Sequence, residues 1–238
     1  HQRDLLRRLR AAAPAERLIR TLVIQKGSAG EVLLSIRHSA LGNRHSPMPP
    51  LLSRFLTHAR LSRVAKYLNG KVLDAGCGHG ELMDYLPVHV HSVTLLDRSP
   101  ERLPRLQTRL SRGTVEARFL LGDIAAGEIA LPAASFDTVV MAALLEHLKI
   151  PAAAVHETRR LLKPGGSLVL TTPTPLGGRL HAWGSHLGLT YREAADEHEG
   201  FFDYEGLKRL LNEDGFNCEL YERFLLGMNQ LVVARKTN

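Results

Sequence analysis

From residue 51 onward, short apolar runs alternate with segments of helical spacing, and this alternation constrains the fold more than any other feature of the chain. The runs are apolar throughout, as in strands that are buried on both faces of a sheet. Because helical segments separate most of these runs, we expect parallel strands joined by right-handed crossovers. The expected fold class is therefore α/β, with a doubly wound and mostly parallel sheet. The predicted strands are 71–74, 92–96, 117–121, 138–141 and 167–171, and the predicted helices are 51–68, 81–86, 100–110 and 152–162.

The end of the chain departs from this alternation. A helix is predicted at 204–213, and the two apolar runs after it, 216–220 and 229–234, are joined by a link too short for a parallel crossover. The chain is therefore expected to end in an antiparallel strand pair at one side of the sheet. Residues 176–200, between the fifth strand and the last helix, form an insertion that contains Gly, His and Trp.

Charge divides the chain into two parts. The formal net charge is +7, but residues 1–63 carry 12 Lys and Arg against 3 Asp and Glu, whereas residues 64–238 carry 19 against 21. The segment with the strand pattern thus has no basic excess with which to hold a polyanion, and nucleic acid is not its expected partner. We predict a basic N-terminal extension and linker at 1–50 and one domain at 51–238.

The extension has two stretches of helical spacing, 3–13 and 15–24, and a short apolar run at 31–36 that is compatible with a strand. Three interpretations are open for it: a solvated extension, a basic surface that contacts anionic membranes, and an Arg-rich, acid-poor leader of mitochondrial type. No apolar run of the chain reaches the roughly 20 residues that a bilayer-spanning helix needs. Two cysteines without metal-ligand spacing predict a reducing, cytoplasmic location.

A glycine-rich loop follows the first predicted strand, in the sequence Val-Leu-Asp-Ala-Gly-Cys-Gly-His-Gly at 72–80. Glycines at alternate positions, Gly76, Gly78 and Gly80, let the backbone turn sharply and approach a ligand that a Cβ would repel. Cys77 between them is expected to pack as a small side chain rather than to react as a thiol. A ligand would lie at the carboxyl ends of the strands, at the switch point of the sheet.

Acidic residues stand at the ends of the first three strands. Asp97 ends the second strand, where a carboxylate can accept both hydroxyls of a ribose, and Asp123 follows the third, where it suits an adenine amine. Asp74 ends the first strand and would repel a pyrophosphate. The GxGxG spacing also differs from the GxGxxG of dinucleotide sites, so a dehydrogenase is disfavoured. The acids favour a cationic nucleoside that carries no phosphate.

Over residues 51–238 these motifs resemble those of class I S-adenosylmethionine-dependent methyltransferases. The glycine loop resembles the first motif of that family, residues 95–97 its ribose-binding acid, 122–124 its adenine-side acid, 136–141 its fourth-strand motif and 162–166 the loop before its fifth strand. The resemblance implies a Rossmann-like methyltransferase sheet and S-adenosyl-L-methionine as the cofactor. The cofactor-binding residues that it implies are Asp74, Gly76, Cys77, Gly78, Gly80, Asp97, Arg98, Asp123, Ile124, Met141 and Ala142.

Residues 145–148 and 198–202 are similar to the small-molecule branch of the family, which includes ubiquinone-biosynthesis O-methyltransferases and relatives acting on sugars and lipids. The implied acceptor is a phenol or quinone precursor, a sugar or a lipid-linked molecule, methylated by in-line displacement. A general base is needed only for a hydroxyl or a protonated amine. The candidates are His147, His181, Tyr191 and His198, and for each of them a packing or hydrogen-bonding role is the alternative.

The insertion at 176–200 is expected to cover the donor pocket as a substrate-side lid, with Trp183 and Tyr191 against an apolar or aromatic acceptor. In the helix before the first strand, Arg54 and His58 are candidates to reach the carboxylate of the donor. Glu146 invites a metal interpretation, but the sequence supplies no clear set of ligands and no metal is expected.

Two other functions stay open. An RNA methyltransferase would use the basic N-terminal segment to hold phosphates. Residues 141–144 read Met-Ala-Ala-Leu where base-amine methyltransferases of the family have Asn/Asp-Pro-Pro-Tyr/Phe, and this disfavours that class. A non-catalytic S-adenosylmethionine-binding module would keep the fold without the chemistry, and the intact glycine loop and acids argue against it.

Overall fold

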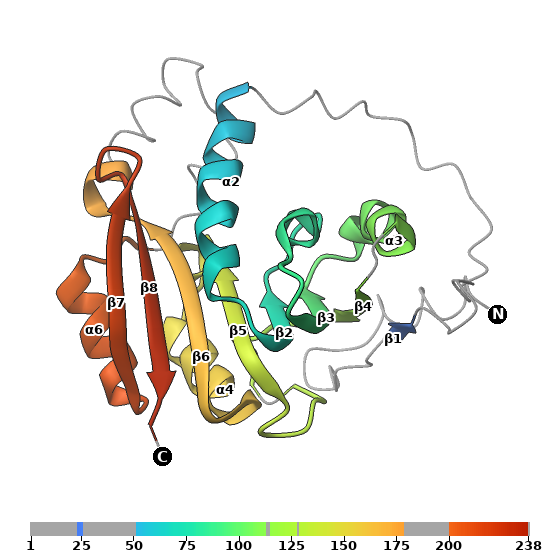
Figure 1. Cartoon of the computed structure of the whole chain (residues 1–238). Coiled ribbons are helices and arrows are strands. Elements are labelled where there is room, and N and C mark those ends of the chain that lie inside the picture. Colours follow the sequence, from blue (N-terminus) through green and yellow to red (C-terminus); the bar gives the residue numbers. More distant parts are fainter. Residues whose placement is uncertain (1–22, 26–50, 113–114, 128, 179–199, 238) are drawn as a thin grey trace.

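The computed structural model describes residues 23–25, 51–112, 115–127, 129–178 and 200–237. These residues form an eight-stranded sheet in the order β1-β4-β3-β2-β5-β6-β8-β7, with helices on both faces (Figure 1). The strands are β1 (Val23–Gln25), β2 (Gly70–Ala75), β3 (Val90–Asp97), β4 (Glu116–Leu121), β5 (Phe136–Ala142), β6 (Leu162–Pro173), β7 (Phe216–Phe224) and β8 (Asn229–Lys236).

The five central strands are parallel. β2 pairs with β3 on one side and with β5 on the other, while β4 extends the sheet beyond β3 and β6 extends it beyond β5. β8 then pairs antiparallel with β6, and β7 antiparallel with β8. The predicted α/β fold, with a mostly parallel sheet and an antiparallel C-terminal pair, is confirmed.

Helices cover the two faces separately. α2, η3 and α3 lie on one face, and α4 and α6 lie on the other (Figure 1). No helix in the part of the chain that the structure describes is long and apolar enough to cross a membrane. The α-helices are α2 (Leu51–Val64), α3 (Leu103–Arg112), α4 (Pro151–Leu161) and α6 (Tyr204–Glu213), and the 3-10 helices are η2 (Ala65–Tyr67), η3 (Glu81–Tyr85), η4 (Pro100–Arg102) and η5 (Leu145–His147).

Each face of the sheet has its own hydrophobic core. Val140 of β5 joins Val64 of α2 in one cluster, whereas its neighbour Val139 joins Val155 of α4 in the other. Successive residues of a strand point to opposite faces, so a strand that feeds two cores must be apolar throughout. This arrangement explains the unbroken apolar runs of the sequence.

The first strand corrects one prediction. β1 begins inside the stretch 15–24, which was expected to be helical, and pairs antiparallel with β4 so that Val23 lies opposite Leu120. β4 would otherwise be the edge of the sheet and would leave a row of backbone groups unpaired. The β-branched residues Val23 and Ile24 suit a strand better than a helix. The rest of the extension, including the run 31–36, lies outside the described residues.

Candidate functional site

The predicted donor-binding residues meet at one edge of the sheet. The parallel register places Asp74 of β2 opposite Leu95 of β3 and Val140 of β5. Asp97 is the last residue of β3, and Asp123 follows β4. This carboxyl edge lies at the top of the molecule in Figure 1. The chain leaves β2 for β3 on one side and reaches β5 on the other, so the edge contains the switch point at which α/β sheets bind ligands.

Backbone hydrogen bonds fix the glycine loop to the end of β3. The N–H groups of Gly76 and Cys77 both donate to Leu96 O, at 2.8 and 3.0 Å. Gly76 has a φ of 71°, and a Cβ there would lie 2.7 Å from Leu144 Cδ1. Gly78 has a φ of 56°, yet the nearest atom to a Cβ there is 3.9 Å away. Gly76 is therefore required for packing, while Gly78 presents bare backbone to open space, as a ligand cradle needs.

The same loop orients the acid at the end of β3. Asp97 accepts hydrogen bonds from Gly78 N and Ser99 N, both at 2.9 Å, one on each carboxylate oxygen. Each oxygen keeps a further lone pair for a ligand. Asp123 accepts from Ala125 N at 2.9 Å, and Arg98 lies 3.9 Å from its other oxygen with 67% of the side chain exposed.

A buried carboxyl group lies under this loop. Burial raises the pKa of Asp74 to about 7, with smaller contributions from the negative charges of Glu81 and Asp97. Burial and these acids also raise the pKa of the Cys77 thiol, so Cys77 is not a thiolate near neutral pH. A cationic ligand would relieve the repulsion among the acids, because an opposite charge favours the ionised form of a carboxyl group.

One charged residue near the acids, Arg60, was missed by the sequence prediction. Arg60 of α2 has its pKa lowered by burial, against the opposing effect of Glu146 and Glu81, and its Nε has no hydrogen-bond partner among the described residues. Glu146, directly after β5, is 1% exposed. By contrast His58, proposed from sequence to reach the donor, is exposed and lies 3.1 Å from Tyr85 Oη. Arg60 could have been found as the arginine on the buried side of α2, two positions after His58.

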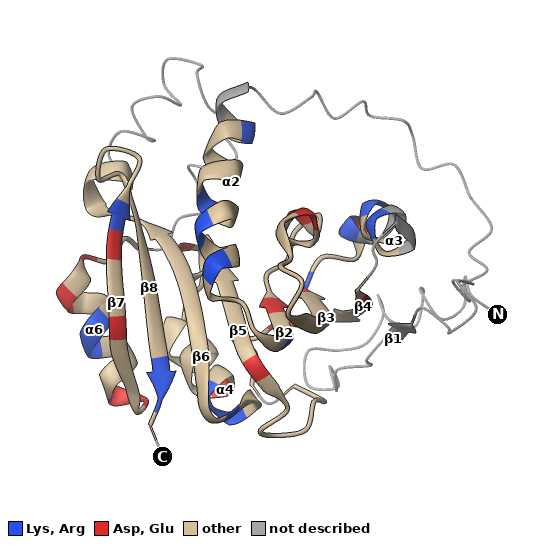
Figure 2. Ribbon diagram, viewed as in Figure 1, with Lys and Arg blue, Asp and Glu red and all other residues tan. Residues whose placement is uncertain are grey.

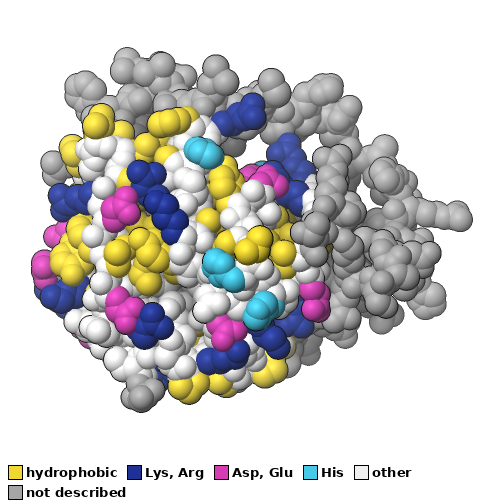
Figure 3. Space-filling view, viewed as in Figure 1, with side chains coloured by type: hydrophobic (Ala, Val, Ile, Leu, Met, Phe, Trp, Pro, Cys, Tyr) yellow, Lys and Arg dark blue, Asp and Glu magenta, His cyan; other side chains and the backbone are white. Residues whose placement is uncertain are grey.

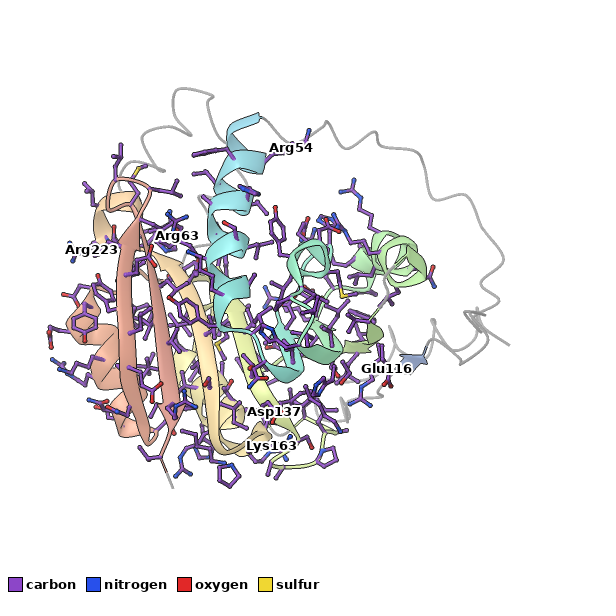
Figure 4. The ribbon with its side chains drawn as sticks, viewed as in Figure 1. Arg54, Arg63, Glu116, Asp137, Lys163 and Arg223 are labelled. Carbon is purple, nitrogen blue, oxygen red and sulfur yellow. The ribbon has the colours of Figure 1, made fainter. Side chains whose placement is uncertain are left out.

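Arg54, the other residue of α2 proposed for the donor, is also exposed and lies near the start of the helix (Figure 4). The helix residue that faces the acids is therefore Arg60 rather than Arg54 or His58. Charged side chains elsewhere on α2 serve packing, since Arg63 donates to Glu222 of β7 at 2.9 Å.

The residues predicted for the acceptor side follow β5. Met141 is fully buried at the end of the strand, and Ala142 is partly buried beside Thr171 of β6. Ala143 has a φ of 54°, an uncommon conformation for a residue other than glycine. His147 in η5 is partly buried. The other acceptor-side predictions lie outside the described residues, namely His181, Trp183, Tyr191 and His198.

A family model described as a methyltransferase domain matches residues 41–221. The chain belongs to this methyltransferase family. The predicted membership of the class I S-adenosylmethionine-dependent methyltransferases is thereby confirmed, and the Rossmann-like sheet described above agrees with it.

Two curated relatives lie on the small-molecule side of the family. A ubiquinone biosynthesis O-methyltransferase of Xanthomonas oryzae pv. oryzae is 36% identical over 146 residues, which cover 57% of this chain and 59% of the relative. A malonyl-[acyl-carrier protein] O-methyltransferase of Paenibacillus sp. is 36% identical over 109 residues, which cover 44% of this chain and 39% of the relative. The matches thus span about two fifths to three fifths of these relatives.

Solved structures agree in fold. A chain from a complex between the Haloferax volcanii Trm112 methyltransferase activator and a methyltransferase superposes with a TM-score of 0.65 at 15% identity, covering 78% of this chain and 92% of that one. A Bacillus halodurans methyltransferase superposes with a TM-score of 0.59 at 19% identity, covering 76% of this chain and 98% of that one. The [4+2]-cyclase SpnF superposes with a TM-score of 0.60 at 17% identity, covering 74% of this chain and 79% of that one. Because a cyclase shares the sheet, fold alone does not define the reaction.

Proposed function

We propose that residues 51–238 transfer a methyl group from S-adenosyl-L-methionine to a small-molecule acceptor by in-line displacement. The observation that carries this proposal is the open backbone at Gly78 above the buried carboxyl of Asp74. A glycine-rich loop surrounded by acids suits a cationic nucleoside and repels a pyrophosphate. The methyltransferase family match and the names of the two O-methyltransferase relatives support the same reaction.

The residues present fit the parts of this donor. Asp97, held by two backbone N–H groups, would accept the ribose hydroxyls with its remaining lone pairs. Asp74 would balance the positive charge, and Arg60, whose Nε has no partner, would bind the carboxylate. The remaining predicted contacts are Gly76, Cys77 and Gly80 in the loop, Arg98, Asp123 and Ile124 at the adenine side, and Met141 and Ala142 under the methionine part.

When bound, the donor supplies a methyl group that its positive charge has already activated, so the protein contributes mainly orientation and exclusion of water. The close contact of Leu144 with the loop at Gly76 holds η5 against the donor pocket. From the end of this segment, His147 would take the proton of an acceptor hydroxyl, because the unperturbed pKa of histidine is near neutral.

We further propose that residues 176–200 cover the acceptor, with Trp183 and Tyr191 against its apolar or aromatic part, and with His181 and His198 as further candidate bases. The acceptor would be a phenol or quinone precursor, a sugar or a lipid-linked molecule. Both curated relatives are named for methylation of oxygen, which favours a hydroxyl or carboxyl acceptor.

The test is a mass-spectrometric screen of the full chain with S-adenosylmethionine and separate pools of phenols, sugars, lipids and RNA. A mass gain of one methyl group in a small-molecule pool is expected. Methylation confined to RNA would replace this proposal with the nucleic-acid alternative. Donor binding without any methylated product would instead favour a non-catalytic binding module.

A further inference from the structure

The exposed apolar side chains of the structure gather at the carboxyl edge. Among the described residues, six large apolar side chains are exposed, and the fold places five of them at this edge: Phe55, Ile150, Leu176, Phe201 and Leu226. The sixth, Val88, precedes β3 and so lies at the opposite edge. Figure 3 shows apolar side chains at the upper left, where the β7–β8 hairpin ends and α2 begins. These apolar side chains thus lie at the same edge of the sheet as the proposed site.

The hairpin tip holds a leucine in an unfavourable conformation. Met228 N donates to Leu225 O at 3.1 Å and closes a turn with Leu226 and Gly227 at its centre. The φ angles of Leu226 and Gly227 are 55° and 81°. Asn-Gly is the preferred pair where both central φ angles are positive. Leu226 is 95% exposed, so its side chain gains nothing from the fold in return for this strain.

Hydrogen bonds hold the tip beside the chain that leaves β6. Thr174 donates from its backbone N to Met228 O at 2.9 Å and from its hydroxyl to Gly227 O at 2.8 Å. Gly177 packs so closely on Met228 O that no Cβ would fit there, and Gly178 packs in the same way on the Phe201 ring. We call Leu176, Phe201 and Leu226 the apolar rim, since these contacts place them on one surface.

Exposed cationic groups lie at the same edge of the sheet as the apolar rim. Arg54 and Lys149 are exposed, and so is Arg223, whose Nε donates to the Tyr221 hydroxyl at 2.7 Å. Stretches of α2 and the upper part of β7 are coloured as Lys or Arg in Figure 2, and Figure 4 shows Arg54 and Arg223 near this edge. Of the nearby acids, Glu222 is engaged by Arg63 and Asp203 accepts from Gly206 N.

The basic part of the sequence joins the chain at the same edge. Residues 1–50 carry 9 Lys and Arg against 3 Asp and Glu, and they connect to the first residue of α2. An apolar surface with surrounding cations is the composition of proteins that lie on anionic membranes, where apolar side chains enter the headgroup region and Arg or Lys contact the phosphates.

We propose that the apolar rim is a contact site for the surface of an anionic lipid membrane, from which a lipid-linked acceptor reaches the pocket. The identity of the acceptor rests on the proposed function, but the membrane contact does not. A rim of three side chains predicts reversible binding, because each buried apolar side chain contributes only a small part of the free energy of adsorption.

The test is co-sedimentation of the full chain with phosphatidylglycerol vesicles and with phosphatidylcholine vesicles. The wild-type chain should bind the anionic vesicles and should be released by salt. Leu226→Asn should reduce the partition coefficient about fivefold, since a polar side chain replaces one that inserts. The variant should fold at least as well as the wild type, because Asn tolerates a positive φ better than Leu.

Val88→Asn is the matched control, because it removes an equally exposed apolar side chain at the opposite edge and should leave vesicle binding unchanged. The proposal would be overturned if the wild-type chain did not bind anionic vesicles. It would also be overturned if Leu226→Asn and the wild type bound equally, because the binding would then belong to other residues. A change in molar mass on light scattering of Leu226→Asn would instead identify the rim as a contact with a second copy. Methyl transfer to a water-soluble acceptor should be equal in both variants, so a failure here is separable from a failure of the proposed function.

Discussion

On the donor side of the carboxyl edge, backbone N–H groups hold the acids in place, as in the contact of Gly78 N with Asp97. On the acceptor side, beyond β5, the surface consists of partly buried and exposed side chains around a strained hairpin tip. A site held by backbone is defined by a few adjacent residues, whereas a surface formed by separate loops depends on how distant segments pack. Changes on the donor side should therefore be severe and specific, and those on the acceptor side graded.

The largest effect is expected for Asp97→Ala, which removes the carboxylate between the loop and the proposed ribose position. Losing charge-assisted hydrogen bonds of this kind costs about 2 kcal/mol, or roughly a thirtyfold weaker Kd for S-adenosylmethionine. Titration calorimetry measures the affinity. Glu116→Ala, an exposed acid at the start of β4, should keep the wild-type value. Equal affinities for both variants would contradict the assignment of Asp97.

Gly78→Ala tests whether the open backbone is a ligand cradle. The new Cβ meets no atom of the described residues closer than 3.9 Å, so it would occupy space that the proposed donor needs. We expect about tenfold weaker donor binding and about 1 kcal/mol lower stability from the positive φ. Gly127→Ala, with a φ of 112° in an exposed turn, should lose similar stability in chemical denaturation but no donor affinity. Parallel losses of affinity in the two variants would identify the effect as strain alone.

The raised pKa of Asp74 makes the donor side sensitive to pH. Its pKa is raised to about 7, mainly by burial. A cationic donor favours the ionised form, so affinity should rise about tenfold from pH 6 to pH 8 and then level off. Without donor, the stability of the fold should change with pH in the opposite direction to the donor affinity. The folded state retains the proton of Asp74 to a higher pH than the unfolded state, so the free energy of unfolding should fall as pH rises through about 7. Asp74→Asn should flatten both profiles, and an unchanged affinity profile would exclude Asp74 as the titrating group.

Arg60→Met should weaken donor binding about fivefold, because it removes the proposed partner of the donor carboxylate while keeping the apolar length of the side chain. Arg63→Met is the matched change on the same helix. Arg63 donates to Glu222 and packs on the Phe224 ring, so its loss should lower thermal stability without changing donor affinity. If Arg63→Met weakened binding more than Arg60→Met, the assignment along α2 would be wrong.

On the acceptor side, Trp183→Ala should raise the KM for the acceptor about threefold and leave the donor Kd unchanged, because one aromatic contact among several is lost. Steady-state kinetics with the acceptor found by the product screen separate the two constants. Unchanged kinetics would remove Trp183 from the acceptor site.

The geometry of the proposed donor side could be predicted from sequence because it is local. Strand, loop and acid follow one another within residues 70–97, and the parallel sheet brings Asp123 and Met141 to the same edge without further information. Arg60 was missed because the orientation of a helix over the loop depends on packing of its other side against the sheet. β1 was predicted as helical because its pairing with β4 is a long-range contact that overrides local spacing.

The acceptor side was less predictable for the same reason. The amphipathic residues of 176–200 predicted a cover for the acceptor. No sequence pattern around Leu226 predicted its positive φ, because that conformation results from the pairing of β7 with β8. The hairpin tip is held by a hydrogen bond between Gly227 and Thr174, which are far apart in the sequence. The exposure of Leu226 therefore depends on a long-range contact.

The most direct test of the donor site is titration calorimetry of the full chain with S-adenosylmethionine and, separately, with NAD⁺. A glycine loop with the acids Asp74 and Asp97 beside it should bind one equivalent of the cationic, phosphate-free nucleoside and give no heat with the dinucleotide. Binding of NAD⁺ at comparable affinity, or the absence of any S-adenosylmethionine binding, would contradict the account.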